Sequence, residues 1–301
     1  MVKVSVIIST YNGKNKICGT LKALESQVFK DFETIVVIDG STDCTFEYIS
    51  GQKFELNLRL HEQVNSGRAN VRNKGAALAK GNLLIFYDDD MVPESDSVHR
   101  HVGFHGKYKN AVCGGNQLEK FDLAVTDFDK YRCEIRQKWI EKYCAPLSQI
   151  KKDNLFLTAA NMSVTTRVFF QLGGFDKSLQ DAEDFIFAHK ALDNEIRLFF
   201  DKKNIAWHTD FCSIRDYINR RRSYTKNFIR LSNIYPELFT EKINATRPGL
   251  LKRIVYRSFG NELTIRLVNN KWLHLFPKNV RYKFYDIAIT SLGTVYTNIP
   301  I

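Results

Sequence analysis

The chain has 301 residues, 44% of them hydrophobic, which is enough for one large domain or two domains with a sizeable core. Its 44 lysines and arginines outnumber 33 aspartates and glutamates, and the charge of +11 favours nucleotides, nucleic acids or anionic membranes as partners. Six cysteines without a C-x-x-C pair argue against a zinc module and a disulfide framework, and for reduced thiols.

The N-terminal residues 1–8 alternate in polarity and lead directly into Ser9-Thr10-Tyr11-Asn12. This pattern predicts a strand and not a secretory signal, which needs a basic region, a longer apolar block and a small-residue cleavage site. No window approaches the roughly 18 uninterrupted apolar residues of a membrane-spanning helix. We therefore expect a cytoplasmic protein.

The first ninety or so residues alternate between apolar runs and helical patterns. Strands are predicted at residues 3–9, 32–38, 56–61 and 83–87, and helices at residues 17–28, 42–49 and 68–79. Gly81 follows the last of these helices in the position of a C-terminal cap. The alternation predicts an α/β fold with a parallel sheet and right-handed crossovers. The chain has no dinucleotide-binding or P-loop glycine motif, so a nucleotide would need another kind of site.

The second part of the chain has a more mixed pattern. Further helices are predicted at residues 94–106, after residue 164 and at residues 185–192, and further strands at residues 111–115 and 196–200, with a last strand ending at Trp207-His208. The aromatic and charged residues 121–143 give no clear assignment. The acidic residues Asp181, Glu183 and Asp184 open the helix at 185–192, where the helix dipole favours negative charge.

Three consecutive carboxylates, Asp88, Asp89 and Asp90, follow the buried run at 83–87. Ionised aspartates this close repel one another, so the cluster needs a cation, basic neighbours or a retained proton. Oxygen ligands of this kind suit Mn²⁺ or Mg²⁺, and a site with few carboxylates usually shares its metal with substrate phosphates. The alternative is an acidic turn exposed to water.

From about residue 211 the composition becomes basic and aromatic. An arginine-rich helix is predicted here, with Arg220, Arg221 and Arg222 at its centre, and later runs at 252–256 and 281–285 mix basic and aromatic residues. We expect a helical basic region over residues 211–301. Two interpretations stay open: a packed subdomain with a basic outer face, or a surface that lies on an anionic membrane.

Six segments occur in a characteristic order over about two hundred residues. They are Ser5-Val6-Ile7-Ile8-Ser9-Thr10-Tyr11-Asn12, Ile38-Asp39-Gly40-Ser41-Thr42-Asp43, Asn65-x-Gly67-x-Ala69-x-x-x-Asn73-x-Gly75, Phe86-Tyr87-Asp88-Asp89-Asp90, Gly173-Gly174-Phe175-Asp176 and Glu183-Asp184. Together they resemble the signature of family-two glycosyltransferases. The resemblance implies a GT-A type domain over residues 1–210, with a mostly parallel sheet flanked by helices, that binds a nucleotide sugar.

By this resemblance, Ser9, Thr10 and Tyr11 contact the nucleotide base and ribose, where a ring can stack and hydroxyls can form hydrogen bonds. Asp39 matches the carboxylate that accepts a hydrogen bond from N3–H of uracil, which favours a UDP-sugar. Many relatives carry two acids at this point, whereas Ile38 precedes Asp39 in this chain. A partly buried Tyr11 and a turn-forming Asp39 are the structural alternatives.

The diphosphate side of the site follows from the same resemblance. Arg72, or Arg68 one turn earlier, is expected to reach the nucleotide or its diphosphate; a solvated helix face is the alternative. Asp88 and Asp89 are expected to contact ribose or metal-bound water. Asp90 and His208 are expected to bind the metal, Mn²⁺ or Mg²⁺, although a lone histidine can also be structural.

The pair Glu183-Asp184 matches the catalytic acids of the family, with Asp184 as the general base. Inverting transfer needs a carboxylate on the face opposite the leaving group, where it takes the proton of the attacking hydroxyl. A helix-capping role for the pair is the alternative. The Q-x-x-R-W motif of processive members is absent, which favours addition of one sugar to a glycan or glycolipid.

Two other functions remain as alternatives at this stage. A sugar nucleotidylyltransferase has a similar sheet, but it needs a glycine-rich basic loop that Asn12-Gly13-Lys14 replaces poorly. A non-catalytic module that binds nucleic acid or a membrane surface would suit the charge of +11. No helix-turn-helix, zinc-finger or RNA-binding signature supports it, so nucleic acid is not expected as a partner.

Overall fold

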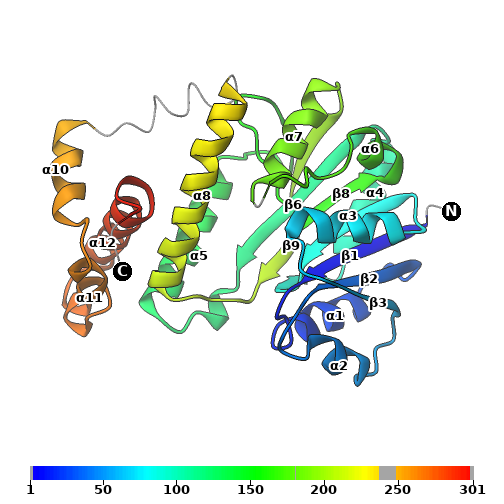
Figure 1. The fold of residues 1–301 in the computed structure, drawn as a ribbon, viewed down its shortest axis with the longest axis horizontal. Helices are drawn as coiled ribbons and strands as arrows, with labels where there is room; N and C mark the ends of the chain where they lie inside the picture. The colour runs from blue at the N-terminus through cyan, green and yellow to red at the C-terminus, as the bar shows by residue number, and fades with distance from the viewer. Residues whose placement is uncertain (1–2, 180, 237–248, 299–301) are drawn as a thin grey trace. The chain divides into compact units, whose positions relative to one another are not determined.

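The computed structural model describes residues 3–179, 181–236 and 249–298. It contains a mixed nine-stranded sheet with the order β3-β2-β1-β4-β8-β6-β9-β5, and β7 also pairs with β9 (Figure 1). The strands are β1 (Val4–Thr10), β2 (Phe32–Asp39), β3 (Asn57–Gln63), β4 (Leu83–Asp88), β5 (Met91–Pro93), β6 (Ala111–Glu119), β7 (Leu147–Ile150), β8 (Asn161–Thr165) and β9 (Arg197–His208).

The first four strands form the parallel half of the sheet, as the alternating pattern predicts. Strands β1, β2, β3 and β4 pair in parallel, so their carboxyl ends reach the same edge. Strand β8 lies antiparallel between β4 and β6, which the sequence did not indicate. The two strands predicted at 196–200 and up to His208 are one strand, β9, with a register shift where it pairs with β6. That prediction of two strands was wrong, because polar residues 201–204 mark an irregularity within the strand and not its end.

Helices cover both faces of the sheet (Figure 1). On one face lie α3 (Arg68–Leu78), α6 (Thr166–Gln171) and α7 (Glu183–Asp193), and on the other α1 (Ile17–Glu25), α2 (Thr45–Ser50) and α4 (Ser97–Lys107). Successive residues of a strand point to opposite faces. Ile7 and Phe86 therefore contact the first set of helices, and Ile8 and Tyr87 the second.

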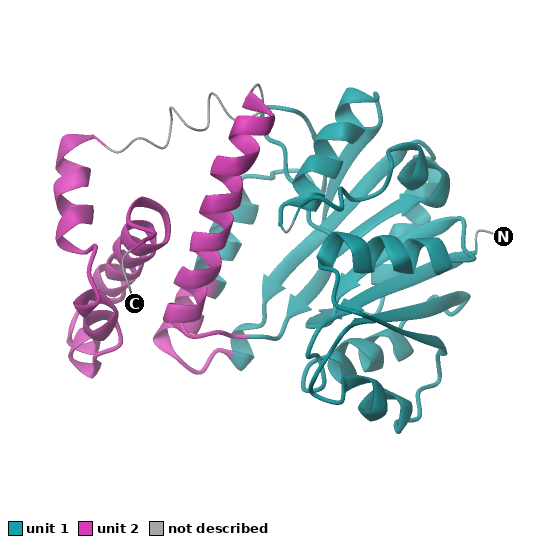
Figure 2. Ribbon diagram, viewed as in Figure 1, with its two compact units in different colours: residues 1–123, 133–210 teal, residues 124–132, 211–301 magenta. Residues whose placement is uncertain are grey.

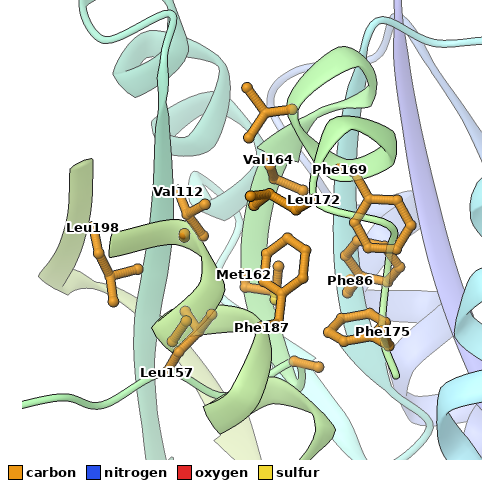
Figure 3. Packing of buried hydrophobic residues seen from close by; sticks show 14 of the residues in the cluster. Phe86, Val112, Leu157, Met162, Val164, Phe169, Leu172, Phe175, Phe187 and Leu198 are labelled. Carbon is orange, nitrogen blue, oxygen red and sulfur yellow. The ribbon is translucent and has the colours of Figure 1, made fainter. Parts of the chain in front are cut away.

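The larger core cluster is built around aromatic rings (Figure 3). Phe86 lies at the centre, with its ring 5.4 Å from that of Phe169 and 5.5 Å from that of Phe175. Phe175 in turn lies 5.2 Å from Phe187 of α7. This packing fixes α7 against the strand that ends in the three aspartates.

The position of Gly81 differs from the prediction of a helix cap. Helix α3 ends at Leu78, and Ala79 leaves it in an extended conformation. A Cβ at Gly81 would lie 2.7 Å from the Lys3 carbonyl and from the Ser5 amide nitrogen. Glycine is needed here because the chain passes directly against β1.

A buried polar network lies between α4 and the sheet. His101 contacts Asn161 at 3.0 Å and Ser163 at 2.8 Å, and His105 contacts Ser163 at 2.9 Å. Burial lowers the pKa of His101 to about 3 and that of His105 to about 4. Both rings are therefore neutral in the folded protein at neutral pH.

Replacing His105 with glutamine is expected to destabilise the protein less as the pH falls. In the wild type, His105 takes up a proton on unfolding between pH 6.5 and about 4, which lowers the free energy of unfolding by up to about 1.4 kcal/mol per pH unit. Glutamine takes up no proton on unfolding, so the variant does not lose stability in this way. Denaturant unfolding between pH 5 and 7 measures the free energy of unfolding of both proteins. Taking the difference between wild type and His105→Gln cancels the contribution of other titrating groups.

The matched control is His99→Gln, because His99 is exposed on the same helix. It removes an imidazole from a solvent-exposed position of α4, so it separates the effect of burial from that of losing a histidine. A constant difference between wild type and His105→Gln would contradict a buried neutral His105.

The contacts within the chain divide it into two compact units (Figure 2). The first consists of Met1–Leu123 and Cys133–Asp210, and the second of Ala124–Arg132 and Phe211–Ile301. Helix α5 (Asp127–Glu141) contributes its first residues to the second unit. No pattern in residues 121–143 predicts that a segment there belongs with the C-terminal region.

The second unit is helical and has its own core. Its elements include α8 (Ile214–Ile234), α10 (Leu250–Ser258), α11 (Leu263–Val268), η2 (Lys271–Leu275), α12 (Lys278–Thr290) and η3 (Ser291–Val295). Ile218, Tyr285 and Leu292 are among its buried residues. Arg281 binds both carboxylate oxygens of Asp127 at 2.8 Å. The C-terminal region therefore packs as a subdomain. Among the described residues, no helix is long and apolar enough to cross a bilayer.

Candidate active site

The sequence-predicted residues come together where parallel strands end. Ser9 of β1 pairs in register with Asp88 of β4, and Asp39 ends the neighbouring strand β2. Ligands of open α/β sheets bind at this edge, beyond the carboxyl ends of the strands. His208 reaches the same region because it pairs with Met91, the residue after Asp90.

Asp90 and His208 form the candidate metal site. Asp90 is buried, and its Oδ2 lies 3.2 Å from Nε2 of His208. Burial raises the pKa of the Asp90 carboxyl, and the histidine opposes that effect. Nδ1 of His208 is buried without a hydrogen-bond partner. A carboxylate oxygen and an imidazole nitrogen are ligands that can bind the same divalent cation.

The geometry fits a cation shared with a substrate. Two neighbouring ligands about 2.1 Å from one octahedral cation lie about 3 Å from each other, close to the spacing of Asp90 and His208. Within the described residues, no group of three or more His, Cys, Asp or Glu side chains assembles around such a point. A cation held here would take its remaining ligands from water and phosphate oxygens, as Mg²⁺ usually does.

Asp89 turns toward β1. Its Oδ2 accepts a hydrogen bond of 2.6 Å from Thr10 Oγ1. Burial, and then the charges of Asp90 and Asp88, raise the pKa of Asp89 to about 7. Gly13 permits this approach, since a Cβ there would lie 1.9 Å from Thr10 Oγ1 and 2.6 Å from Asp89 Oδ2. Thr10 thus holds an acidic side chain, a contact that the sequence did not predict.

Arg72 joins two acidic groups that are far apart in the sequence. Its guanidinium donates to Asp88 through Nη2 and to Glu183 through Nη1. Burial opposes the charge of Arg72, yet Asp88 and Glu183 raise its pKa overall. In return, although burial acts against ionisation, Arg72 lowers the pKa of Asp88. The nucleotide contact predicted for Arg72 stays a prediction, and the structure gives this side chain a bridging contact as well.

Glu183 and Asp184 have different surroundings at the start of α7. Glu183 is buried and paired with Arg72. Asp184 accepts hydrogen bonds from the amides of Phe185 at 2.8 Å and Ala159 at 3.2 Å. Burial, followed by the charge of Glu183, raises the pKa of Asp184 to about 7. A carboxylate with this pKa is suited to take a proton near neutral pH.

The residue before this pair has an unusual backbone conformation. Ala182 has φ of 64° and ψ of 20°, in the left-handed region that costs a non-glycine residue about 1 kcal/mol or more. No side chain caps the helix at Ala182. The pair Glu183-Asp184 therefore begins α7 without serving as its N-cap, and the backbone turn before it aims both side chains toward the sheet edge.

Asp39 holds the loop between β3 and α3. Its Oδ1 accepts hydrogen bonds from the Gln63 side-chain amide at 2.8 Å and from the Ser66 amide at 3.0 Å, and Oδ2 accepts one from the Gly67 amide at 2.9 Å. The structural alternative for Asp39 is a turn before Gly40-Ser41, whereas its carboxylate holds the loop that contains Ser66 and Gly67. Oδ2 has a second lone pair, so recognition of a base by Asp39 stays a prediction.

The remaining predicted residues lie at the end of β1 and at the start of α3. Tyr11 follows β1, and its side chain is 52% exposed, which leaves a ring face accessible for stacking. Ser9 is half-buried at the end of the same strand. Arg68, the alternative to Arg72, is more exposed and lies 3.5 Å from Asp181.

Lys16 is a candidate site residue that the sequence reasoning missed. Its Nζ lies 3.0 Å from Oδ2 of Asp210. Burial lowers the pKa of Lys16, but Asp210 and then Asp89 and Asp90 raise it overall. The available signal was a lysine just before α1, in a loop that begins at the end of β1. The acidic cluster therefore has a cation beside it.

The glycine-rich segment before α7 is fixed by α3. The side-chain amide of Asn73 donates to the Phe175 carbonyl at 2.7 Å, and its oxygen accepts from the Phe175 amide at 2.9 Å. This double contact joins the segment that contains Asn73 to the segment that contains Phe175, 102 positions later. It positions the chain that leads to Glu183 and Asp184.

The model of the family described as glycosyl transferase family 2 matches residues 5–172, more than half of the chain. The chain belongs to this family. The family-two resemblance of the sequence motifs is thereby confirmed. The match includes the ends of β1, β2 and β4 and the three aspartates, and it stops before α7.

Individual relatives agree with this assignment. The Escherichia coli protein WfaP, UDP-Glc:alpha-D-GlcNAc-diphosphoundecaprenol beta-1,3-glucosyltransferase, is 29% identical over 144 residues, which cover 48% of this chain and 57% of WfaP. The chain thus spans less than two thirds of the curated relatives that it matches.

Solved structures confirm the GT-A type fold. TarS 1–349 of Staphylococcus aureus in complex with UDP superimposes with a TM-score of 0.57 at 19% identity, covering 98% of this chain and 90% of that one. The mannosyltransferase PcManGT of Pyrobaculum calidifontis in complex with GDP-Man and Mn²⁺ gives a TM-score of 0.62 at 16% identity, covering 98% and 87%. At these identities the likeness concerns the fold.

Proposed function

We propose that this protein is an inverting, metal-dependent glycosyltransferase that moves one sugar from a UDP-sugar to a glycan or lipid-linked acceptor. The observation that carries the proposal is the bridge from Asp88 through Arg72 to Glu183. It ties the acidic end of β4, where a diphosphate and cation would bind, to the first turn of α7, where Asp184 lies.

Asp90 and His208 would hold the divalent cation, Mn²⁺ or Mg²⁺. Bound there, such a cation neutralises the charge that develops on the departing diphosphate. The presence of Mn²⁺ in the PcManGT complex supports this assignment for a related fold. Lys16, beside Asp89 and Asp90, adds a positive charge at the same end of the site.

Asp184 acts as the general base. The acceptor hydroxyl attacks the anomeric carbon from the face opposite the diphosphate, and its proton passes to the Asp184 carboxylate as the bond to the diphosphate breaks. The nucleoside diphosphate leaves with the bonding electrons, and a single attack from the opposite face inverts the configuration at the anomeric carbon. Correct placement of such a base contributes about 10²- to 10⁴-fold to the rate.

Four features support a UDP-sugar and a lipid-linked acceptor. Asp39, at the end of β2, can accept from N3–H of uracil, and exposed Tyr11 can stack on the base. The TarS complex contains UDP, and the name of WfaP specifies UDP-Glc and a diphosphoundecaprenol-linked acceptor. An acceptor of that kind lies in a membrane, so we place the enzyme at the cytoplasmic face of one, bound peripherally through its basic C-terminal region.

A donor and acceptor screen tests this function. The protein with Mn²⁺ is incubated with UDP-, GDP- and dTDP-sugars and with a GlcNAc-diphosphate lipid, and release of nucleoside diphosphate is measured. We expect release from a UDP-sugar that depends on the acceptor, and a product whose anomeric proton coupling shows inversion. Release from GDP- or dTDP-sugars alone would contradict the donor, and a product with retained configuration would contradict the mechanism.

A further inference from the structure

Helix α10 has an apolar face that stays exposed among the residues that the structure describes. Leu250 is 76% exposed, Leu251 81%, Ile254 57% and Val255 39%. With 3.6 residues per turn, these four side chains lie on one side of the helix and Tyr256 on the other. Tyr256 is the half-buried residue of α10, and its carbonyl accepts a hydrogen bond from Ser291 of η3. The helix thus contacts its unit through the side that carries Tyr256.

Basic side chains border this face on both sides. Arg253 and Arg257 lie next to Leu250 around the helix, and Lys252 lies next to Val255. All three are exposed, and α10 contains no acidic residue. An exposed apolar stripe between cations is the arrangement of a helix that lies in a membrane interface, with its apolar side among acyl chains and its cations at anionic headgroups.

The arginine-rich helix α8, which the sequence emphasised, is a weaker candidate. Arg222 donates to the Leu292 carbonyl at 2.8 Å, and burial lowers its pKa. The apolar residues Ile214 and Ile218 of α8 are buried in the unit's core. The first apolar residues of α8 are therefore packed into the core, whereas the cations of α10 border an apolar face that is exposed.

We propose that α10 is the membrane-contacting element of this protein and that it lies in the interface of an anionic bilayer through Leu250, Leu251, Ile254 and Val255. This deepens the peripheral attachment proposed above by naming its surface. A second copy is a poorer occupant, because pairing two such faces would bring the cations of both helices together. The helix has nine residues, whereas stable protein interfaces use about 20–30 residues a side.

Binding of full-length variants to vesicles tests the proposal. The assay contains no donor or acceptor, so a negative result would not contradict the proposed glycosyltransferase activity. Co-sedimentation uses vesicles with phosphatidylglycerol and vesicles of phosphatidylcholine alone. The wild type should bind the anionic vesicles. Neutralising α10 by K252Q, R253Q and R257Q together should lower partitioning about a hundredfold, since each cation near an anionic surface contributes a factor of about five. Replacing Leu251 and Ile254 with serine should lower it at least about tenfold.

Matched changes on α8 are the controls. R220Q, K226Q and R230Q together remove the same charge from exposed positions, and serines at Ile229 and Ile234, 57% and 52% exposed, remove comparable apolar surface. These variants should bind within about threefold of the wild type, because only long-range attraction is reduced. All substituted side chains of α8 and α10 are exposed, and thermal unfolding verifies that each variant is folded.

Three outcomes would overturn the proposal. The first is a wild type that does not bind anionic vesicles. The second is a loss of binding in the α8 variants but not in the α10 variants. The third is a serine variant of α10 that binds like the wild type while changing the oligomeric state in solution, which would assign the face to a second copy.

Discussion

Replacing Arg72 with methionine is expected to lower the free energy of unfolding by about 3–5 kcal/mol. Arg72 is 5% exposed and its partner Glu183 3%, so the substitution leaves a buried carboxylate without its counter-ion. The free energy of unfolding of Arg72→Lys should lie between those of the wild type and Arg72→Met. A lysine ammonium keeps the charge but lacks the planar fork that reaches Asp88 and Glu183 together. Denaturant unfolding at pH 7 measures all three proteins.

Two further variants separate this bridge from a general effect of removing charge. Arg68→Met changes an exposed arginine of the same helix, 3.5 Å from Asp181, and should cost less than about 1 kcal/mol. Combining Arg72→Met with Glu183→Gln should recover part of the loss, since the unpaired charge is removed. An Arg72→Met protein as stable as Arg68→Met would show that the bridge does not hold α7 to the sheet.

Replacing Asp184 with asparagine is expected to lower kcat by about 10²- to 10⁴-fold while nucleotide affinity changes little. Asparagine keeps the shape, but its single amide oxygen can replace only one of the two carboxylate oxygens that accept from the Ala159 and Phe185 amides, and it cannot take a proton. For the wild type, the raised pKa of about 7 predicts that kcat/KM rises with pH and levels off above pH 7. Steady-state rates from pH 5.5 to 8.5 measure both effects.

The same substitution should stabilise the protein at alkaline pH. Because folding raises the pKa of Asp184 above that of the unfolded chain, its contribution to stability is present at low pH and is lost as the pH rises through about 7. Asp184→Asn should therefore gain stability over the wild type between pH 6 and pH 8. Asp193→Asn, an exposed acid near the other end of α7, is the control and should change neither kcat nor this pH dependence. Equal activity of Asp184→Asn and Asp193→Asn would contradict the role of Asp184 as general base.

The sequence could predict that most residues of the candidate site lie at one sheet edge, because strand ends are marked locally. Apolar runs that stop at Thr10, Asp39 and Asp88 show where the parallel strands end, and parallel strands bring these residues to one edge. The family-two resemblance then added Asp184 and His208, which lie beyond the predicted parallel half. These assignments needed only short segments and their order.

What the sequence could not show are the contacts between distant segments. Nothing local indicates that Arg72 meets Glu183, 111 positions later, or that Asn73 holds the Phe175 backbone. The antiparallel direction of β8 likewise depends on its neighbours β4 and β6. Lys16 is a candidate site residue because the loop after β1 brings it near Asp89 and Asp90. Each of these contacts depends on packing across the sheet, which no periodicity records.

The exposed face of α10 was also hidden in the sequence. The pattern of residues 252–256 showed basic and aromatic residues together, but it could not separate a helix that buries its apolar side from one that exposes it. Tyr256, and not the leucines, faces the unit. The distinction came from the exposed fraction of each side chain.

The most direct test of a metal and nucleotide site at the end of β4 is thermal unfolding with UDP, GDP, CMP or dTDP, each with and without Mn²⁺. A ligand at about 100 times its Kd adds roughly 2.7 kcal/mol to the free energy of unfolding. We predict stabilisation by UDP that requires Mn²⁺, is lost in Asp90→Ala, and is kept in Asp153→Ala, which removes an exposed carboxylate. Stabilisation by UDP that is equal without Mn²⁺, or that persists in Asp90→Ala, would contradict this site.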